Sequence, residues 1–390
     1  MMKLISAMLL LAGAVDACGQ MSTYSLNFKV SSESFPDTVA IDYATGRVVV
    51  PVQTDGQTLR FLLDTGASQT TVYSDTPISN TQSAGFTVSR DAMNVADTVS
   101  KVVLPPLTIG KTTFTGCQAV VQKRVARQNN IDGILGFDLF NWGLQAKIDT
   151  RQRQMVITTD RNFFDGEPGC EWRYKLNYHV PYITVSPFAR YKEQALFDTG
   201  SRMLYIMNKE SFDKGERKAR GSLAQQVESR TTGRWAMGHG GVEKRGEVVF
   251  MSLDSVAIGR QAIRQVRTLT TMGASKIGAE LLRHGTLVIA PHRKAMRFCP
   301  YDGAGDVVVA NTQIDKAIIQ ENDMAVVGLV REGSTPYQAG LREGDVIIKV
   351  DSRELSSFAE YMAFVPEKDK VYTFVVRNTR GFLKEVKMPF

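Results

Sequence analysis

The pattern of hydrophobic and polar positions predicts β-structure, most clearly near the start of the chain. Residues 47–52 and 58–63 are rich in β-branched and apolar side chains, and Asp55-Gly56 separates them. Two such runs around an Asp-Gly turn predict a β-hairpin. Because the second run ends in apolar residues directly before Asp64, this aspartate is expected at the end of a buried strand.

The same local pattern occurs twice along the chain. Residues 61–68 end in Asp-Thr-Gly-Ala-Ser and recur as residues 195–201, which end in Asp-Thr-Gly-Ser. Further apolar segments that end in glycine follow each copy in the same order, closing at Gly110 and Gly136 in the first copy and at Gly259 and Gly278 in the second. The distance along the chain between matching segments is not the same for every pair, which is the result expected from insertions in loops. The ordered recurrence predicts an internal duplication, so two similar halves are expected to build one fold.

The composition limits the classes of protein that the chain can form. With 390 residues, 43% hydrophobic and 22% charged, a globular protein of two or three domains is expected. The formal net charge of +7 is a mild excess, and no dense basic stripe with interleaved aromatic residues occurs, which disfavours nucleic-acid binding. The four histidines show no metal-ligand spacing and there is no Cys-x-x-Cys, so neither a metal nor another cofactor is expected.

Four cysteines are too few for a secreted disulfide scaffold. Once Cys18 is set aside, Cys117, Cys170 and Cys299 cannot all pair within one chain. A bridge between Cys170 and Cys299 and a set of three buried thiols are both compatible with the sequence.

The first residues carry the pattern of an export signal. Lys3 precedes an apolar run over residues 4–15, which is too short to span a bilayer. Residues 1–17 are therefore predicted to be a signal peptide, and the protein is expected in the bacterial cell envelope. The residues before Cys18 resemble a bacterial lipobox, so lipid attachment at Cys18 is one expectation and ordinary cleavage near Ala17 is the other.

Two aspartates related by a duplication have a chemistry that one aspartate lacks. A single aspartate at a strand end is usually a turn or cap residue, but a pseudo-twofold arrangement would bring Asp64 and Asp198 together on its axis. Two carboxylates about 3 Å apart cannot both ionise, so they share one proton. One then acts as a base on a water molecule while the other donates a proton to a substrate carbonyl.

These motifs resemble those of aspartic proteases. The two Asp-Thr-Gly loops are similar to the active-site loops of that family, and residues 134–136 and 276–278 resemble its apolar-Gly segment. Two lobes in one chain resemble pepsin, whereas Ala67 after the first loop is closer to the retropepsins. The resemblance implies an aspartic endopeptidase that uses no cofactor, with a polypeptide as its substrate.

The resemblance also implies an architecture and a set of site residues. The expected fold is mainly β, with duplicated β-barrel-like lobes at residues 30–165 and 166–305. Asp64 and Asp198 are the implied catalytic dyad. Support of the active-site loops is implied for Thr65, Gly66, Thr199, Gly200 and Ser201.

One departure between the two loops predicts an asymmetric site. Ser201 can hydrogen-bond the outer oxygen of Asp198, whereas Ala67 offers no such group to Asp64. Unequal environments are therefore expected for the two aspartates.

The last seventy residues carry a different pattern. Gly-Ser-x-Pro, Ala-Gly-Leu and Gly-Asp-x-Ile elements resemble a PDZ domain over residues 318–390, an α+β unit of the kind found in bacterial envelope proteases. A Ser-x-x-Glu capping box from Ser357 to Glu360 predicts a short helix within it. Such domains bind extended peptides as an added strand, so a peptide or protein ligand is implied, and packing against the protease is the alternative.

Three classes of function follow from these features. The preferred class is an exported aspartic endopeptidase with a C-terminal PDZ domain. Residues 87–98 and residues 233–246 are the two candidates for the hairpin that forms its flap. A catalytically silent peptide-binding envelope protein could use the same cleft and PDZ domain, and an envelope scaffold would tolerate the loss of Asp64. The presence of both Asp64 and Asp198 favours the enzyme.

Overall fold

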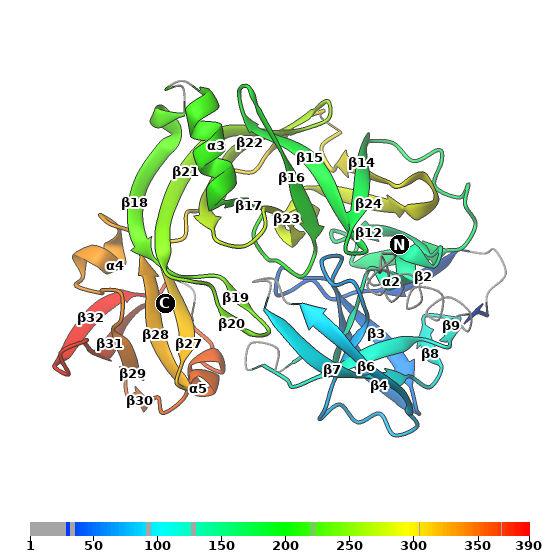
Figure 1. Cartoon of the computed structure of the whole chain (residues 1–390), viewed down its shortest axis with the longest axis horizontal. Helices are drawn as coiled ribbons and strands as arrows, with labels where there is room; N and C mark the ends of the chain where they lie inside the picture. The colour runs from blue at the N-terminus through cyan, green and yellow to red at the C-terminus, as the bar shows by residue number, and fades with distance from the viewer. Residues whose placement is uncertain are drawn as a thin grey trace, which may run out of the picture.

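The computed structural model describes residues 29–31, 36–90, 95–125, 130–219, 221, 223–303, 305–367 and 369–390. Strands hold 52% of the residues and helices 10%, so the predicted mainly β class is confirmed. The predicted signal peptide and Cys18 lie outside the described residues. Figure 1 shows the first half of the chain in blue and cyan, the second half in green and yellow, and a C-terminal unit in orange and red.

The first half builds a ten-stranded sheet with the order β1-β9-β8-β3-β4-β11-β5-β10-β7-β6. Its strands are β1 (Lys29–Val30), β3 (Val49–Thr54), β4 (Gln57–Leu63), β5 (Thr71–Tyr73), β6 (Gln82–Arg90), β7 (Ala96–Val103), β8 (Leu107–Ile109), β9 (Thr112–Thr115), β10 (Gln118–Gln122) and β11 (Gly133–Leu135). The predicted hairpin is present as β3 and β4, which pair antiparallel. Asp55 and Gly56 form its turn with φ of 50° and 75°, the positive values that a two-residue hairpin turn requires.

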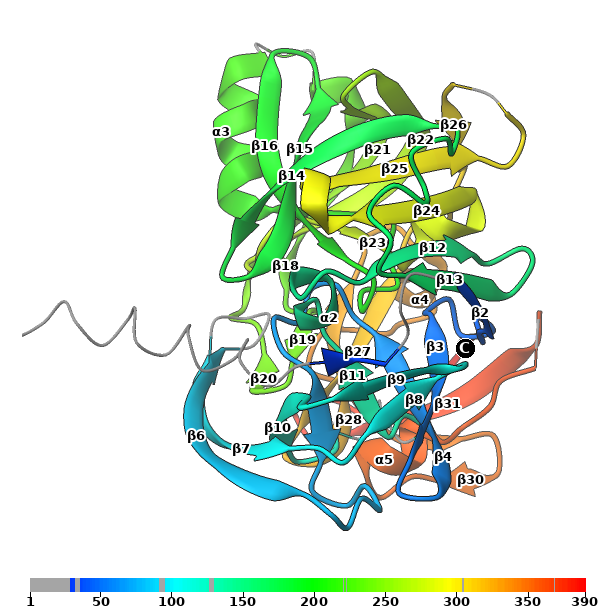
Figure 2. The same cartoon turned by 90° about the vertical axis from the view of Figure 1, so that its right-hand side faces the viewer.

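The second half contributes most of a fourteen-stranded sheet. The strands of this sheet are β2 (Asp37–Ala40), β12 (Gln145–Asp149), β13 (Gln154–Thr158), β14 (Cys170–Asn177), β15 (Val180–Phe188), β16 (Tyr191–Asp198), β17 (Tyr205–Asn208), β18 (Val227–Gly233), β21 (Gly246–Ile258), β22 (Gln261–Thr271), β23 (Lys276–Gly278), β24 (Gly285–Ala290), β25 (Ala295–Pro300) and β26 (Val307–Val308). The helical segments of the two halves are α2 (Asp138–Asn141), α3 (Lys209–Ala219), η2 (Ala224–Gln226), η3 (Ala279–Arg283) and η4 (Pro291–Arg293). β2, β12 and β13 come from the first half, and β12 pairs antiparallel with β24 of the second. The two halves therefore share one continuous sheet (Figure 2).

The strands that lead into the two Asp-Thr-Gly loops have equivalent neighbours. β4 pairs parallel with β11, which also pairs antiparallel with β5. β16 pairs parallel with β23, and β23 pairs antiparallel with β17. Parallel pairs of β10 with β5 and of β22 with β17 complete the same arrangement in each half. The sequence repeat thus corresponds to a repeat of strand topology.

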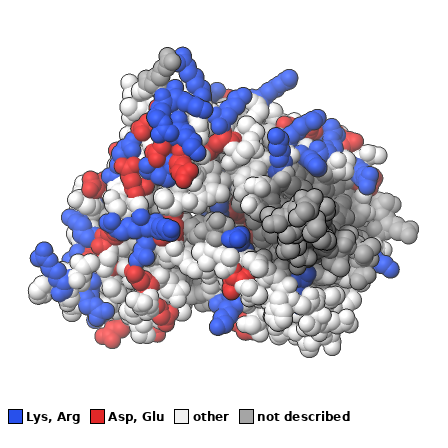
Figure 3. All heavy atoms as spheres, viewed as in Figure 1, with Lys and Arg blue, Asp and Glu red and all other residues white. Residues whose placement is uncertain are grey.

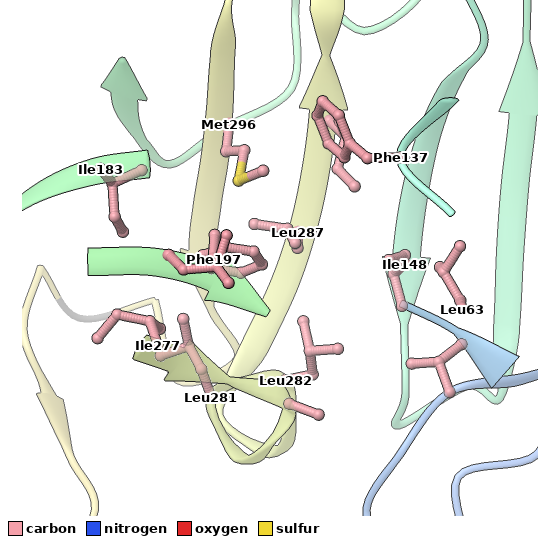
Figure 4. Close-up of a cluster of buried hydrophobic side chains, with 14 of the residues drawn as sticks. Leu63, Phe137, Ile148, Ile183, Phe197, Ile277, Leu281, Leu282, Leu287 and Met296 are labelled. Carbon is pink, nitrogen blue, oxygen red and sulfur yellow. The ribbon is translucent and has the colours of Figure 1, made fainter. Parts of the chain in front are cut away.

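One apolar core runs beneath both loops (Figure 4). Leu63 and Phe197, the residues directly before the two aspartates, are 1% and 0% exposed. Ile148 of β12 and Leu287 of β24 pair across the shared sheet and belong to the same core. Because burying a side chain of this size contributes about 1.5–3 kcal/mol, the strand ends that carry the aspartates have little freedom to shift.

The C-terminal unit is a six-stranded sheet with two short helices. Its elements are β27 (Lys316–Glu321), β28 (Met324–Val330), α4 (Thr335–Gln338), β29 (Val346–Val350), β30 (Arg353–Glu354), α5 (Phe358–Met362), β31 (Val371–Arg377) and β32 (Leu383–Pro389). Ser357 caps α5 as predicted, because its Oγ accepts a hydrogen bond from Glu360 N (3.2 Å). The Glu360 carboxylate accepts from Ser356 N (2.6 Å), one residue before the cap. The unit has a core of its own, which includes Phe358 and Phe374.

The C-terminal unit docks on the second half where two backbones approach closely. Arg234 N, just past β18, donates to Gly328 O (2.9 Å). A Cβ atom on Gly328 would lie 2.4 Å from Arg234 O, so only glycine fits this crossing. Arg245 and Glu343 form a two-point ion pair between the same two parts of the chain, at 2.7 and 2.8 Å.

A short hairpin of the second half reaches along the C-terminal unit (Figure 1). It consists of β19 (Met237–Gly238) and β20 (Gly241–Val242), and β20 contacts β27. Met237 packs against the core of the C-terminal unit. This contact couples the hairpin to the docked unit.

Trimming Met237 is expected to loosen this hairpin. Because the lost apolar burial is worth about 1–2 kcal/mol, Met237→Ser should speed amide hydrogen exchange in residues 237–242 by about tenfold. Leu383→Ser is the control, since Leu383 is an apolar side chain of the C-terminal unit that is 62% exposed, and it should leave that exchange unchanged. Equal exchange rates in Met237→Ser and wild type would show that the hairpin does not depend on the C-terminal unit.

Basic and acidic side chains are interspersed on the face of the molecule seen in Figure 3. Over α3 the two signs stand next to each other, so this face presents no basic stripe. Among the described residues, no helix combines the length and the apolar character that crossing a membrane requires.

The three described cysteines carry free thiols. Cys117 is buried, whereas Cys170 and Cys299 are partly exposed on the neighbouring strands β14 and β25. The structure therefore contains no bridge between Cys170 and Cys299, and one of the three thiols is buried rather than all of them.

Candidate active site

Asp64 and Asp198 meet where the two halves join, as the duplication predicts. Asp64 directly follows β4, and Asp198 is the last residue of β16. Their carboxyl groups hydrogen-bond each other. The glycine of each loop packs on the aspartate of the other: a Cβ atom on Gly200 would lie 2.3 Å from Asp64 Oδ2, and one on Gly66 would lie 2.6 Å from Asp198 Cγ. Glycine is therefore needed at both positions for the carboxyl groups to meet.

Thr65 and Thr199 tie the two loops together through a reciprocal set of hydrogen bonds. Thr65 N donates to Thr199 Oγ1 (3.0 Å), and Thr199 N donates to Thr65 Oγ1 (3.1 Å). Each hydroxyl then donates to a carbonyl oxygen of the opposite strand, Thr65 to Phe197 O and Thr199 to Leu63 O, both at 2.6 Å. Both threonines are 0% exposed, so the four hydrogen bonds are shielded from water.

Backbone N–H groups hold one oxygen of each aspartate. Asp64 Oδ1 accepts from Gly66 N (2.8 Å) and Ala67 N (3.2 Å). Asp198 Oδ1 accepts from Ser201 N (3.1 Å). Among the described residues, Ser201 thus donates its hydrogen bond to Asp198 from the backbone nitrogen. The hydrogen bond expected from the sequence was one from the Ser201 hydroxyl.

The asymmetry expected between the two aspartates is present, but a lysine causes it. Lys276 Nζ lies 2.8 Å from Asp198 Oδ2, and the two side chains are 13% and 8% exposed. Lys276 is the first residue of β23 and reaches the dyad from beside Asp198. In the sequence, residues 276–278 match an apolar-Gly segment, and that match does not predict this contact. The signal for it is a charged residue where the matching segment has Ile134.

The two carboxyl groups differ in how readily they ionise. Burial, followed by the negative charge of Asp198, raises the pKa of Asp64 to about 7. Burial also opposes ionisation of Asp198, but the Lys276 ammonium outweighs it and lowers the pKa of Asp198 below its ordinary value. When the pair holds a single proton, these opposite shifts in pKa favour its residence on Asp64.

Asp138 is a further buried carboxyl group, close behind the first loop, that the sequence motifs do not single out. Its Oδ2 accepts from Thr70 N (2.9 Å) and its Oδ1 from Thr70 Oγ1 (3.1 Å). Burial raises the pKa of Asp138 to about 7. These contacts fix the chain that follows the first Asp-Thr-Gly loop, and Asp138 is a support for the loop rather than a member of the dyad.

The two hairpins that are candidates for the flap occupy equivalent places in the two halves. β6 pairs with β7 next to β10, and β18 pairs with β21 next to β22. Residues 91–94, at the tip of the first hairpin, lie outside the described residues. The second hairpin carries β19 and β20 at its tip, so its tip is the segment that packs on the C-terminal unit.

The base of the second hairpin is built around a buried carboxylate, Glu243, which is 4% exposed. Its Oε1 accepts from Trp235 N and Ala236 N, both at 3.0 Å. Its Oε2 accepts from Thr271 Oγ1 (2.6 Å) and Met272 N (2.8 Å). Four donors on one carboxylate give the hairpin a fixed base on β22.

Within the part of the chain that the structure describes, no three His, Cys, Asp or Glu side chains are grouped as a metal site requires.

Comparison with solved structures gives matches at low identity. The aspartic proteinase from Irpex lacteus is 14% identical, with a TM-score of 0.46 over 69% of this chain and 98% of its own. Basic 7S globulin from soybean is 10% identical, with a TM-score of 0.42 over 68% of this chain and 95% of its own. No curated protein gives a sequence match.

A family model gives a match on the first half of the chain. The model described as aspartyl protease matches residues 50–139. This segment runs from β3 into α2 and contains the first Asp-Thr-Gly loop, with Asp64, Thr65 and Gly66. The first half of this protein is thus similar to the aspartyl protease family at the loop that carries the first aspartate.

Proposed function

We propose that this protein hydrolyses peptide bonds as an aspartic-type endopeptidase. The observation that carries the proposal is the contact between the two Asp-Thr-Gly loops, which holds Asp64 and Asp198 as a hydrogen-bonded carboxyl pair. The aspartyl protease model that matches the first copy supports it. The second copy supplies the second carboxyl group, and a polypeptide is the substrate that this chemistry serves.

A water molecule between the two carboxyl groups is the proposed nucleophile. The ionised carboxylate takes a proton from this water as its oxygen bonds to the scissile carbonyl carbon, and the protonated carboxyl gives its proton to the carbonyl oxygen. The tetrahedral diol then collapses and the C–N bond breaks. The leaving nitrogen takes the proton that the base gained from the water, and a diol hydroxyl returns a proton to the other carboxylate, which restores the pair. Each half of the chain supplies one of the two groups that this proton exchange needs.

Cleavage of a peptide library in water labelled with heavy oxygen tests the proposal. One labelled oxygen is expected in each new carboxyl group, because the attacking water becomes part of it. Cleavage should fall as the pH rises through about 7, since above the pKa of Asp64 the pair loses the proton that the carbonyl oxygen must receive. Absence of cleavage at every pH between about 3 and 8 would contradict the endopeptidase and favour a catalytically silent peptide-binding protein.

For the C-terminal unit we propose a PDZ-type role in binding extended peptides. β27 pairs with β28, and within the described residues no strand pairs with its other edge, so an added strand has a place to bind. β20 of the second hairpin contacts the same strand. A peptide bound to β27 would therefore alter the position of the tip of this hairpin. Ligand binding to the C-terminal unit would in this way be connected to the second half of the protein.

We also propose that the protein is exported to the bacterial cell envelope. The apolar run over residues 4–15 supports export, and the pattern before Cys18 supports attachment to the membrane by a lipid. Substrates would then be polypeptides of that compartment.

A further inference from the structure

Lys276 stands at a position where the first half of the chain has an apolar residue. Lys276 pairs with Leu196, two residues before Asp198, and Ile134 pairs with Leu62 at the same place in the first half. The duplicated topology makes the two positions equivalent. A cation has therefore been placed where the fold accepts an apolar side chain.

Ionisable groups from three strands surround the ammonium group of Lys276. Its Nζ lies 2.8 Å from Asp198 Oδ2 on β16. Asp64, at the end of β4, and Tyr182, on β15, are close enough to interact with its charge. Because Lys276 and Asp198 are only 13% and 8% exposed, dissolved salt screens their interaction weakly.

Stability alone does not account for this ion pair. Removing two charges from water costs free energy that their attraction often fails to exceed, and apolar residues of similar volume are commonly as stable or more so. Ile134 shows that the fold accepts such a residue at the equivalent position. The position of Lys276 beside Asp198 therefore points to a role in the proton transfers of the two aspartates.

We infer that Lys276 is a positioning residue of the active site, which keeps Asp198 as the carboxylate and leaves the shared proton on Asp64. The inference rests on the proposed function and assigns the two roles within it. Asp198 takes the proton from the attacking water, Asp64 protonates the carbonyl oxygen, and Lys276 keeps its own protons throughout. Because the cation favours the ionised form of Asp198, the singly protonated pair persists to lower pH than two aspartates alone would allow.

The pH profile of kcat/KM, measured with a peptide that the enzyme cleaves, tests this role. Lys276→Met keeps the length of the side chain and removes its charge, so the acidic limb should move to higher pH by at least about one unit. Lys276→Arg keeps the charge and should hold the acidic limb near its wild-type position. Lys192→Met is the matched control, because Lys192 is an exposed lysine on the same strand as Asp198. An acidic limb that stays in place in Lys276→Met would overturn the inference.

Carbon-13 NMR of labelled aspartate carboxyl groups separates this inference from the endopeptidase itself. Asp64→Asn and Asp198→Asn assign the two signals. In wild type Asp198 should ionise at lower pH than Asp64, and Lys276→Met should raise the midpoint of Asp198. An unchanged midpoint would overturn the inference even in an active enzyme, whereas a raised midpoint in a protein that cleaves no peptide would uphold the assignment of the proton and contradict the endopeptidase.

A second variant guards against a failure to fold. Lys276→Ile copies the residue that the first half carries at this position, and thermal unfolding checks that each variant is folded before its carboxyl groups are titrated. The same rise in the midpoint of Asp198 is expected, because isoleucine also removes the charge. A folded Lys276→Ile with the wild-type midpoint would overturn the inference as well.

Discussion

Replacing Asp64 or Asp198 with asparagine is expected to lower kcat for peptide cleavage by at least about 10³-fold. Asparagine neither accepts a proton from water nor donates one to a carbonyl oxygen at these pH values, so each variant lacks one of the two proton transfers. Asp254→Asn, at an exposed position on β21, is the control and should cleave at the wild-type rate. Cleavage that survives in both dyad variants would refute the role of the pair.

The two dyad variants are expected to differ in stability. Asp198→Asn leaves the Lys276 ammonium without its counter-ion in a site where the lysine is 13% exposed, which costs about 3–5 kcal/mol. Asp64→Asn replaces a carboxyl group whose pKa burial raises to about 7, and it leaves the Lys276–Asp198 ion pair in place, so its effect on the free energy of unfolding should be smaller. Urea unfolding at about pH 6 measures the difference, and equal stabilities would show that Lys276 finds another partner.

Removing either threonine hydroxyl from the loop pair is expected to destabilise the whole protein. Thr65→Val and Thr199→Val each leave a buried N–H and a buried carbonyl oxygen without a partner, which should cost about 2–4 kcal/mol in the free energy of unfolding. Because the two hydroxyls belong to one network, the double variant should lose less than the sum of the single variants. Urea unfolding gives these values.

Serine at the same positions is the control for this network. Thr65→Ser and Thr199→Ser keep the hydroxyl group and lose one methyl group, so most of the stability should return. If the valine and serine variants unfold at the same urea concentration, the hydroxyl groups do not hold the two loops together.

The meeting of Asp64 and Asp198 was predictable because its determinants are local and occur twice. Each apolar strand that runs into an Asp-Thr-Gly loop indicates a buried strand end, and the recurrence indicates the twofold relation that joins the two ends. The β3–β4 hairpin and the Ser357 cap were predictable for the same reason, since a few neighbouring residues encode each of them.

Lys276 was not predictable as part of the site, because the match between copies made its segment look apolar. Its role depends on which side chain the start of β23 faces, and that follows from the pairing of β23 with β16. The docking of the C-terminal unit on the second half was not predictable from the sequence for a similar reason. It depends on the approach of Arg234 to Gly328, two residues far apart in the chain that no local pattern relates.

The sheet that both halves share has a consequence for how the chain can be divided. Its seam is the pairing of β12 with β24, in which Ala146, Lys147 and Ile148 lie opposite Ile289, Val288 and Leu287. A cut between β13 and β14 would leave each fragment with a bare strand at this seam and with one aspartate of the pair. Unpaired edges of this kind are templates for strand addition. The two fragments are therefore each other's natural complement, and reassociation along β12 and β24 would restore in one step both the sheet and the second carboxyl group.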